Sequence, residues 1–167
     1  MTSEPVGAKP ALRPATPEDV EAIAGLLHDG WRDGHLGHVP EALHAYRTLA
    51  HFRQRVPPRL RATTVATVGS RIVGFVTLLD DEVEQIYVTR DARGGGAAQA
   101  LLRHAEQALA ARYDVGWLAV VAGNARARRF YERSGWRDAG AFDYAAEITN
   151  GTLPVRSHRY EKRLARG

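Results

Sequence analysis

A run of glycines after an arginine is the part of the sequence best suited to binding an anion. The run reads Arg93-Gly94-Gly95-Gly96-Ala97-Ala98 and lies between a predicted strand and a predicted helix. The N–H groups that open a helix have no partners inside it, and the helix dipole gives them partial positive charge. Glycine lets the backbone approach an anion because no Cβ stands in the way. The sequence therefore predicts a pyrophosphate site here, with a flexible strand–helix connection as the alternative.

Two other glycine-rich phosphate motifs do not match this segment. A Walker loop requires lysine and then serine or threonine directly after its last glycine, and no such pair follows here. A dinucleotide-binding fingerprint requires a small residue at position 99 and an acidic residue about 20 positions later. Position 99 is Gln99, which is too large for that role.

A second group of residues lies on one predicted helix, 124–133. Asn124 and Tyr131 are seven positions apart, almost two turns, so they share a helix face. Ala127 lies between them and is small, which leaves a groove for an elongated ligand. The amide and the phenol can therefore bracket a ligand. The alternative is an ordinary amphipathic helix in which Tyr131 is half-buried and hydrogen-bonded.

The elements that must position these residues alternate in type along the chain. Capping residues and hydrophobic spacing predict a first helix over 16–28, followed by a glycine-bearing loop over 29–39. A second helix is predicted over 40–54 and ends before the prolines at 57 and 58. The whole predicted order is β-α-α-β-β-β-α-β-α-β-β. The predicted strands are 11–13, 62–68, 72–79, 83–88, 115–121, 136–145 and 155–164, with a further helix after Gly94.

The composition is that of an ordinary globular domain: 167 residues, 44% hydrophobic and 25% charged. We expect residues 1–9 to be a disordered tail and residues 10–167 to form a single domain. The absence of cysteine excludes disulfides, thiolate metal ligands and a cysteine nucleophile. No apolar run approaches the ~20 residues of a membrane span, and the N-terminus lacks the apolar core of a signal peptide. We therefore expect a cytoplasmic protein that makes no membrane contact.

The charge balance is basic and comes almost entirely from arginine. The net charge is +4, the sequence pI is about 9.8, and of the 23 basic residues only Lys9 and Lys162 are lysines. Arginine presents a planar fork of donors that suits phosphate and carboxylate. The arginines are spread along the chain and form no basic stripe, so we expect no nucleic-acid binding. Binding of a small anionic cofactor explains the excess of basic residues at least as well as nucleic-acid binding does.

Both motifs resemble those of the GNAT superfamily of acetyl-CoA-dependent N-acetyltransferases. Segment 93–98 is similar to the family pattern Arg/Gln-x-x-Gly-x-Gly/Ala, preceded by a strand that ends in Val88. Segment 124–136 is similar to the later pattern Asn-x-x-Ala-x-x-x-Tyr-x-x-x-Gly-Phe/Trp. The element order agrees with the family over about residues 11–164. One departure is Ala97, where the family usually has a larger aliphatic residue.

The resemblance implies an α/β (α+β) GNAT fold, a mixed, mostly antiparallel sheet splayed between its fourth and fifth strands. It implies acetyl-CoA as co-substrate in that split, and no metal. Backbone groups near Val88 and the side chain of Asn124 would contact the pantetheine arm, and Arg129 or Arg126 would reach the nucleotide phosphates. The residues expected to bind the cofactor are Val88, Arg93, Gly94, Gly95, Gly96, Ala97, Ala98, Gln99, Asn124 and Arg129.

The resemblance also implies direct attack of an amine on the thioester in a ternary complex, which needs an acid and a base. Tyr131 is expected to protonate the departing thiolate, whose thiol has a pKa near ~8.5. A backbone N–H at or beside Val88 is expected to stabilise the oxyanion. The expected base is Glu84, or else Glu82, and strand alternation predicts that both share a face with Ile86 and Val88. The alternative is a solvated carboxylate at a strand start.

Acceptor specificity in this family depends on the region between the first helices, here 31–40. Trp31, His35 and His38 are expected to form an aromatic wall beside the amine, with a capping loop of solvated histidines as the alternative. A metal site is disfavoured because no acidic ligand motif or zincin spacing accompanies the histidines. The acceptor is expected to be a small-molecule amine or a protein amine, and the resemblance allows a homodimer. The alternative function is a non-catalytic acyl-CoA-binding or sensing module on the same fold.

Overall fold

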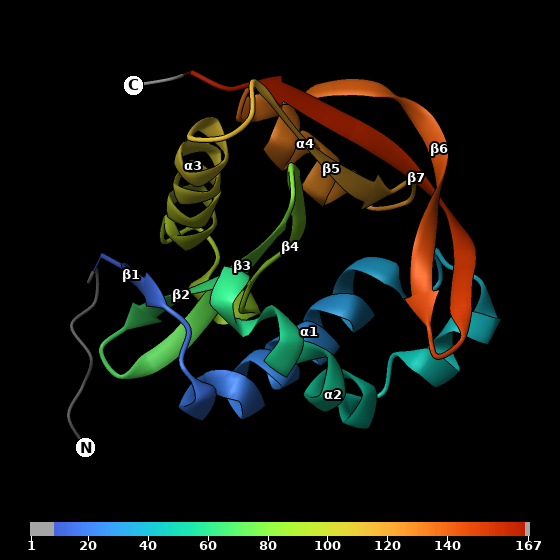
Figure 1. Ribbon diagram of the computed structural model, residues 1–167, viewed down its shortest axis with the longest axis horizontal. Helices are drawn as coiled ribbons and strands as arrows, with labels where there is room; N and C mark the ends of the chain where they lie inside the picture. The colour runs from blue at the N-terminus through green and yellow to red at the C-terminus, as the bar shows by residue number, and fades with distance from the viewer. Residues whose placement is uncertain (1–8, 166–167) are drawn as a thin grey trace.

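Helices cover both faces of one sheet in the computed structural model, which describes residues 9–165 (Figure 1). The predicted tail, 1–9, lies outside this range except for Lys9, which is exposed and has no regular structure. In this range no helix is long and apolar enough to cross a membrane. The helices are α1 (Val20–His35), α2 (Leu49–Arg59), α3 (Ala97–Ala110) and α4 (Ala125–Arg133). The strands are β1 (Ala11–Pro14), β2 (Thr63–Val68), β3 (Arg71–Leu79), β4 (Glu82–Val88), β5 (Val115–Val121), β6 (Arg137–Ile148) and β7 (Gly151–Arg163).

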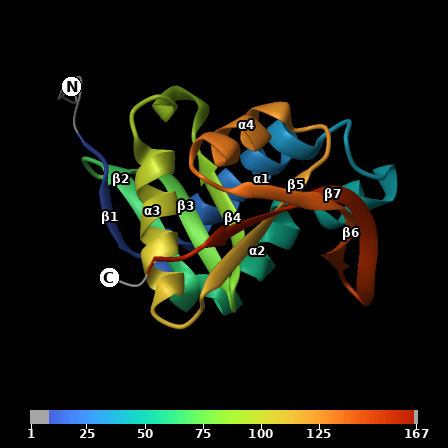
Figure 2. The ribbon, with the colours of Figure 1, turned by 90° about the horizontal axis from the view of Figure 1, so that it is seen from above.

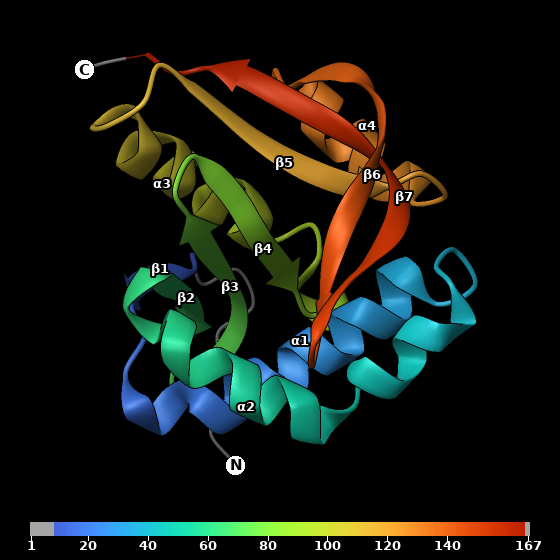
Figure 3. The same ribbon diagram turned by 45° about the vertical axis from the view of Figure 1, so that its right-hand side comes forward.

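The sheet is mixed and opens in its middle. Its strand order is β1-β2-β3-β4-β5-β7-β6, and every neighbouring pair is antiparallel except β4 and β5. These two parallel strands pair at one position, Glu82 opposite Trp117, beside a 3.1 Å hydrogen bond from the Trp117 N–H to the Asp81 carbonyl. Beyond that point they diverge (Figure 3). The predicted splay between the fourth and fifth strands is confirmed.

Two hydrophobic clusters attach the helices to opposite faces of the sheet (Figure 2). On one face, Leu101 and Leu102 of α3 are buried with Val76 and Val88 of the sheet. On the other face, α1 and α2 bury a second set of side chains: Ile23, Leu27, Phe52 and Val56 against Val65 and Phe75. Burial of each such side chain stabilises the fold by ~1.5–3 kcal/mol. Packing of helices on both faces therefore holds in place the strands beside the opening.

The β6–β7 hairpin is long and reaches back to the N-terminal half of the chain. Its residues Ala146 and Val155 are buried with Val121 of β5 and with Leu43, which lies in a 3-10 turn between α1 and α2. Figure 3 shows the hairpin tip beside the α1–α2 layer. The hairpin thus closes one side of the opening between β4 and β5.

The first two helices differ from the predicted boundaries. Helix α1 runs to His35, through the stretch 29–39 that was predicted as a loop, and a 3-10 turn over 41–46 replaces the start of the predicted second helix. Helix α2 begins at Leu49 and includes both prolines, ending at Arg59. Tertiary packing explains the first difference: a Cβ at Gly30 would lie 2.6 Å from the Tyr87 ring, so the glycine lets the helix pass close to β4. Val56, just before the prolines, is buried in the same layer and holds the end of α2 in place.

This close approach predicts opposite outcomes for two glycines of the same helix. Gly30→Ala should lower the free energy of unfolding by ~1–3 kcal/mol, because its Cβ must displace the Tyr87 ring. Gly25→Ala meets nothing within 4 Å and should gain ~0.5–1 kcal/mol from its better helix propensity. Urea unfolding of the two variants checks this. Equal stability would show that α1 does not need the close contact.

Candidate active site

The turn before α3 holds its backbone N–H groups open toward one side. Gly94 and Gly96 have φ of 82° and 88°, left-handed values that glycine adopts without strain. A Cβ built on either would meet nothing within 4 Å. Within residues 9–165 no acceptor bonds the N–H groups of Gly94, Gly96 or the first helical residues, Ala97–Gln99. Such a concave set of amides at a helix start is suited to an anion.

Arginines beside this turn are held by a carboxylate from α1. The Asp33 carboxylate accepts hydrogen bonds from Arg90 at 2.7 Å, from Arg93 at 3.1 Å and from the Tyr87 hydroxyl at 3.1 Å. The expected cofactor contact Arg93 therefore lies beside the turn with its guanidinium positioned by Asp33. Sequence reasoning missed Asp33 because it fell in a predicted loop. Continuing the helical spacing past His28 would have placed it on the same helix as Gly30.

The two alternative arginines of α4 differ in position. Arg126 is exposed overall, but partial desolvation and then repulsion from Arg93 lower its pKa, so its guanidinium is close enough to feel the charge beside the turn. Arg129 is exposed and makes no ion pair with the described residues. The geometry favours Arg126 over Arg129 as the arginine near the glycine turn.

A β-bulge in β4 changes which way its glutamates point. Gln85 pairs with Thr77 and Val83 with Leu78, so Glu84 is the extra residue between them. Val83, Ile86 and Val88 all pack in the cluster on the α3 face. The two glutamates on either side of Val83 therefore point to the other face, toward α2 and β6. The expectation that they share a face with Ile86 and Val88 is wrong, because the bulge interrupts strict alternation.

Glu84 is taken up by an ion pair. Its side chain is only 3% exposed, and its carboxylate accepts a 2.7 Å hydrogen bond from Nε of Arg59 at the end of α2. Arg59 also binds the Glu147 carboxylate at 2.8 Å. Protonating Glu84 would break a part-buried ion pair, which disfavours this residue as a proton acceptor.

Glu82 has the properties that the base requires. It is 6% exposed and accepts a 2.9 Å hydrogen bond from the Tyr144 hydroxyl of β6. Burial, reinforced by the nearby charges of Glu84 and Asp81, raises the pKa of the Glu82 carboxyl to about 7. Because Glu82 also forms the single β4–β5 pair, this carboxyl lies at the point where the two strands part.

Asn124 lies at the start of helix α4, and Tyr131 lies within the same helix. The Asn124 side chain caps the helix, accepting a 3.2 Å hydrogen bond from the Ala127 N–H. Tyr131 is 8% exposed, packs among aromatic rings including Trp136, and lies in one cluster with Val88. Its hydroxyl has no hydrogen-bond partner among residues 9–165, and burial raises the pKa of the phenol well above its usual value. Tyr131 is thus a buried, protonated donor, and the half-buried, hydrogen-bonded alternative does not describe it.

The aromatic residues of the acceptor region separate into two places. Trp31 stacks on His35 with ring centroids 6.1 Å apart, and His44 meets the Trp31 ring edge-on at 5.2 Å. His38 instead lies against Gly123, just before α4. The structure therefore groups Trp31 and His35 with His44, which sequence reasoning did not assign, and places His38 next to the start of α4.

Comparisons with known proteins agree with this geometry. The profile of the acetyltransferase (GNAT) family matches residues 22–136. An uncharacterised N-acetyltransferase of Mycobacterium tuberculosis is 32% identical over 130 residues, covering 71% of this chain and 81% of the relative. A GCN5-related N-acetyltransferase from Rhodopseudomonas palustris has the same fold, with a TM-score of 0.74 and 22% identity over 97% of this chain and 100% of that one. The PaiA N-acetyltransferase of Thermoplasma acidophilum, in complex with coenzyme A, has a TM-score of 0.72 and 16% identity over 93% of this chain and 99% of that one.

The buried carboxyl of Glu82 predicts a pH-dependent stability. A carboxyl whose pKa is higher in the folded state than in the unfolded state stabilises the fold at low pH, and this contribution is lost as the pH rises through the folded value, here about 7. Glu82→Gln cannot ionise, so its Tm should rise relative to that of the wild type between pH 5 and pH 8. Thermal unfolding measures this, with the exposed Glu41→Gln as control. Parallel curves for Glu82→Gln and the wild type would contradict the raised pKa.

Proposed function

Because the chain belongs to the GNAT family of acetyltransferases, we propose that it transfers an acetyl group from acetyl-CoA to an amine, which attacks directly within a ternary complex. The observation that carries the proposal is Tyr131, a buried residue whose hydroxyl has no hydrogen-bond partner among residues 9–165. Its presence on α4 is consistent with a donor used by a bound substrate.

The turn before α3 suits the pyrophosphate of coenzyme A. Its free amides and open glycine faces allow phosphate oxygens to approach the backbone, and Arg93 and Arg126 add positive charge beside it. Asp33 orients the Arg93 guanidinium. Acetyl-CoA, when bound, supplies the thioester that the amine attacks. Asn124 is proposed to contact the pantetheine arm through its amide nitrogen, since its oxygen caps α4.

Glu82 is the proposed base. An alkyl ammonium must lose a proton before it can attack, and its ordinary pKa is about 10.4. A carboxyl with a pKa of about 7 accepts that proton far more readily than an ordinary carboxyl does. The hydrogen bond from Tyr144 fixes the orientation of the Glu82 carboxylate. Glu84 has the separate task of holding Arg59.

Tyr131 is the proposed acid. The raised pKa of its phenol keeps Tyr131 protonated, so its O–H can donate to the departing sulfur and stabilise the negative charge that develops there. The backbone N–H of Val88 or of a neighbouring residue is proposed to stabilise the oxyanion. The residues of this chain thus remove one proton and return one, with the phenol and the carboxyl on different elements.

Tyr131→Phe tests the assignment of the acid. Loss of the proton donor should lower kcat by roughly 10²–10⁴-fold, while the dissociation constant for acetyl-CoA stays within about 2-fold. Thiol release with a broad panel of amines measures kcat, and Tyr113→Phe, at the end of α3, serves as the control tyrosine. Unchanged kcat in Tyr131→Phe would remove its assignment. Saturable acetyl-CoA binding without turnover of any amine by the wild type would indicate an acyl-CoA-binding module instead.

Gly96→Ala tests the pyrophosphate site. An alanine at a φ of 88° is strained by ~1–2 kcal/mol and adds a Cβ to the anion-facing turn, so we expect roughly 10-fold weaker binding of CoA. The control is Gly69→Ala, which carries comparable strain at a φ of 60° in the β2–β3 hairpin. Titration calorimetry with CoA compares the two. Equal loss of affinity in both variants would show that strain alone, and not the anion site, is responsible.

A further inference from the structure

Two arginines near Tyr144, the hydrogen-bond partner of Glu82, make no ion pair with a carboxylate among residues 9–165. Arg47 is 8% exposed, and its Nη1 donates to the carbonyls of Tyr46 and Glu147, each at 2.8 Å. Arg55 of α2 is half-buried and makes no ion pair with residues 9–165. Burial, with repulsion from Arg55, lowers the pKa of Arg47 to about 10, although the charge of Glu147 acts in the opposite direction. A buried cation without a counterion is costly and is uncommon unless a ligand supplies the charge.

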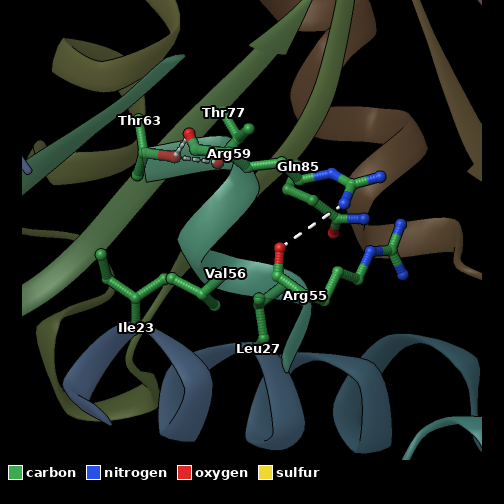
Figure 4. A pocket seen from close by; sticks show the side chains of 8 residues that line it. All are labelled: Ile23, Leu27, Arg55, Val56, Arg59, Thr63, Thr77 and Gln85. Atoms are coloured by element: carbon green, nitrogen blue, oxygen red, sulfur yellow. Dashed lines mark hydrogen bonds between the residues drawn. The ribbon is translucent and has the colours of Figure 1, made fainter. Parts of the chain in front are cut away.

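The nearby carboxylates do not neutralise this pair. Both Glu84 and Glu147 bind Arg59, at 2.7 Å and 2.8 Å. Figure 4 shows the guanidinium groups of Arg55 and Arg59 extending to the same side of the pocket, next to Gln85. Arg59 is therefore satisfied within the protein, whereas Arg55, one turn earlier on α2, presents its guanidinium without a partner.

Unpaired ring nitrogens adjoin the same arginines. The Trp31 Nε1, His35 Nδ1 and His44 Nε2 atoms are buried and have no hydrogen-bond partner among the described residues. Burial and the charge of Arg47 lower the pKa of His35 to about 4, so the ring is neutral at physiological pH. Trp31 can only donate, and a neutral histidine can donate from one nitrogen. An anionic oxygen group would accept hydrogen bonds from these rings and from the two arginines.

We infer that the acceptor is a small amine that also carries an anionic oxygen group, carboxylate or phosphate, and that Arg47 and Arg55 bind this group. The inference rests on the proposed function, because it places the amine at Glu82. Tyr144 connects the two places: its hydroxyl donates to Glu82, and Arg55 is close enough for its charge to act on the same phenol group. One molecule could therefore present its amine to Glu82 and its anion to Arg55, an arrangement that excludes a simple alkylamine as the preferred acceptor.

A series of anionic amines of increasing length, each compared with a neutral analogue, tests this inference. The carboxylate series is glycine, β-alanine, 4-aminobutyrate and 6-aminohexanoate, each compared with its own carboxamide. The phosphate arm compares 2-aminoethyl phosphate with ethanolamine. We expect kcat/KM for at least one anionic amine to exceed that of its neutral partner by 10-fold or more, mainly through KM. The arm with the larger ratio identifies carboxylate or phosphate.

Variants at position 55 separate the anion contact from general damage. Arg55→Gln should reduce the anionic-to-neutral ratio to near 1 and leave kcat/KM for the neutral amine within 2-fold, while Arg55→Lys should restore part of the ratio. The control is Arg103→Gln, an exposed arginine on α3, which should keep the wild-type ratio. Arg47 is unsuitable for this purpose because it also joins two backbone carbonyls.

The outcomes distinguish this inference from the proposed function. Equal kcat/KM for anionic and neutral amines, or a ratio insensitive to Arg55→Gln, would overturn the inference while leaving N-acetyl transfer intact. If no amine is acetylated, calorimetric titration of the same pairs into the CoA-bound protein decides the matter. Binding of the anionic members that Arg55→Gln abolishes would support the anion site and reject catalysis. Absence of such binding would overturn the inference.

Discussion

The structure depends on a parallel strand pair that separates after one position. β4 and β5 meet at Glu82 and Trp117 and diverge beyond them, leaving backbone groups of both strands without a ladder partner. Backbone groups away from water must find partners, so the opening is tolerable only if a ligand or solvent can enter. Antiparallel pairing on both outer sides, β3 with β4 and β7 with β5, holds the two halves apart. Helices α3 and α4 and the β6–β7 hairpin pack around the separated strands, and they carry residues of the candidate site.

Buried ionisable groups collect where the strands part, and their arrangement assigns different tasks to similar residues. Glu84 is paired with Arg59, whereas Glu82, two positions away, has only the hydroxyl of Tyr144. The first carboxylate forms an ion pair with a guanidinium, and the second has its pKa raised by burial. Two glutamates on one strand therefore differ in environment because of what each one contacts, and this difference is the basis for proposing Glu82 as the base.

Arginines supply positive charge at two places, the turn before α3 and the region of Arg47 and Arg55, but their contacts differ between the two. At the turn before α3, Asp33 holds Arg90 and Arg93 beside open amides. On the side proposed to bind the acceptor, Arg47 and Arg55 make no ion pair with a carboxylate among residues 9–165. Arg47 is held by backbone carbonyls that satisfy its donors without cancelling its charge. The first arrangement is the basis for the proposed cofactor site, and the second is the basis for the proposed site for the anionic group of the acceptor.

Local features of the sequence determined the family, the element order and the glycine turn before α3. The glycines at 94–96 and the seven-residue spacing of Asn124 and Tyr131 depend on backbone conformation within one turn or one helix, so they can be read without knowing the fold. The opening between the fourth and fifth strands followed from the family resemblance and is confirmed. The roles of the individual site residues remain proposals.

The tertiary structure decided which side chains face one another. The bulge at Glu84 arises from the register between β3 and β4, and alternation within β4 alone cannot reveal it. Helix α1 continues to His35 because a glycine lets it pass Tyr87, a contact with a strand more than 50 residues away. Asp33, Tyr144 and Arg55 acquire their significance only through such distant neighbours. Burial and charge pairing are properties of the packed chain, and they determine which glutamate can act as a base and which arginines remain unpaired.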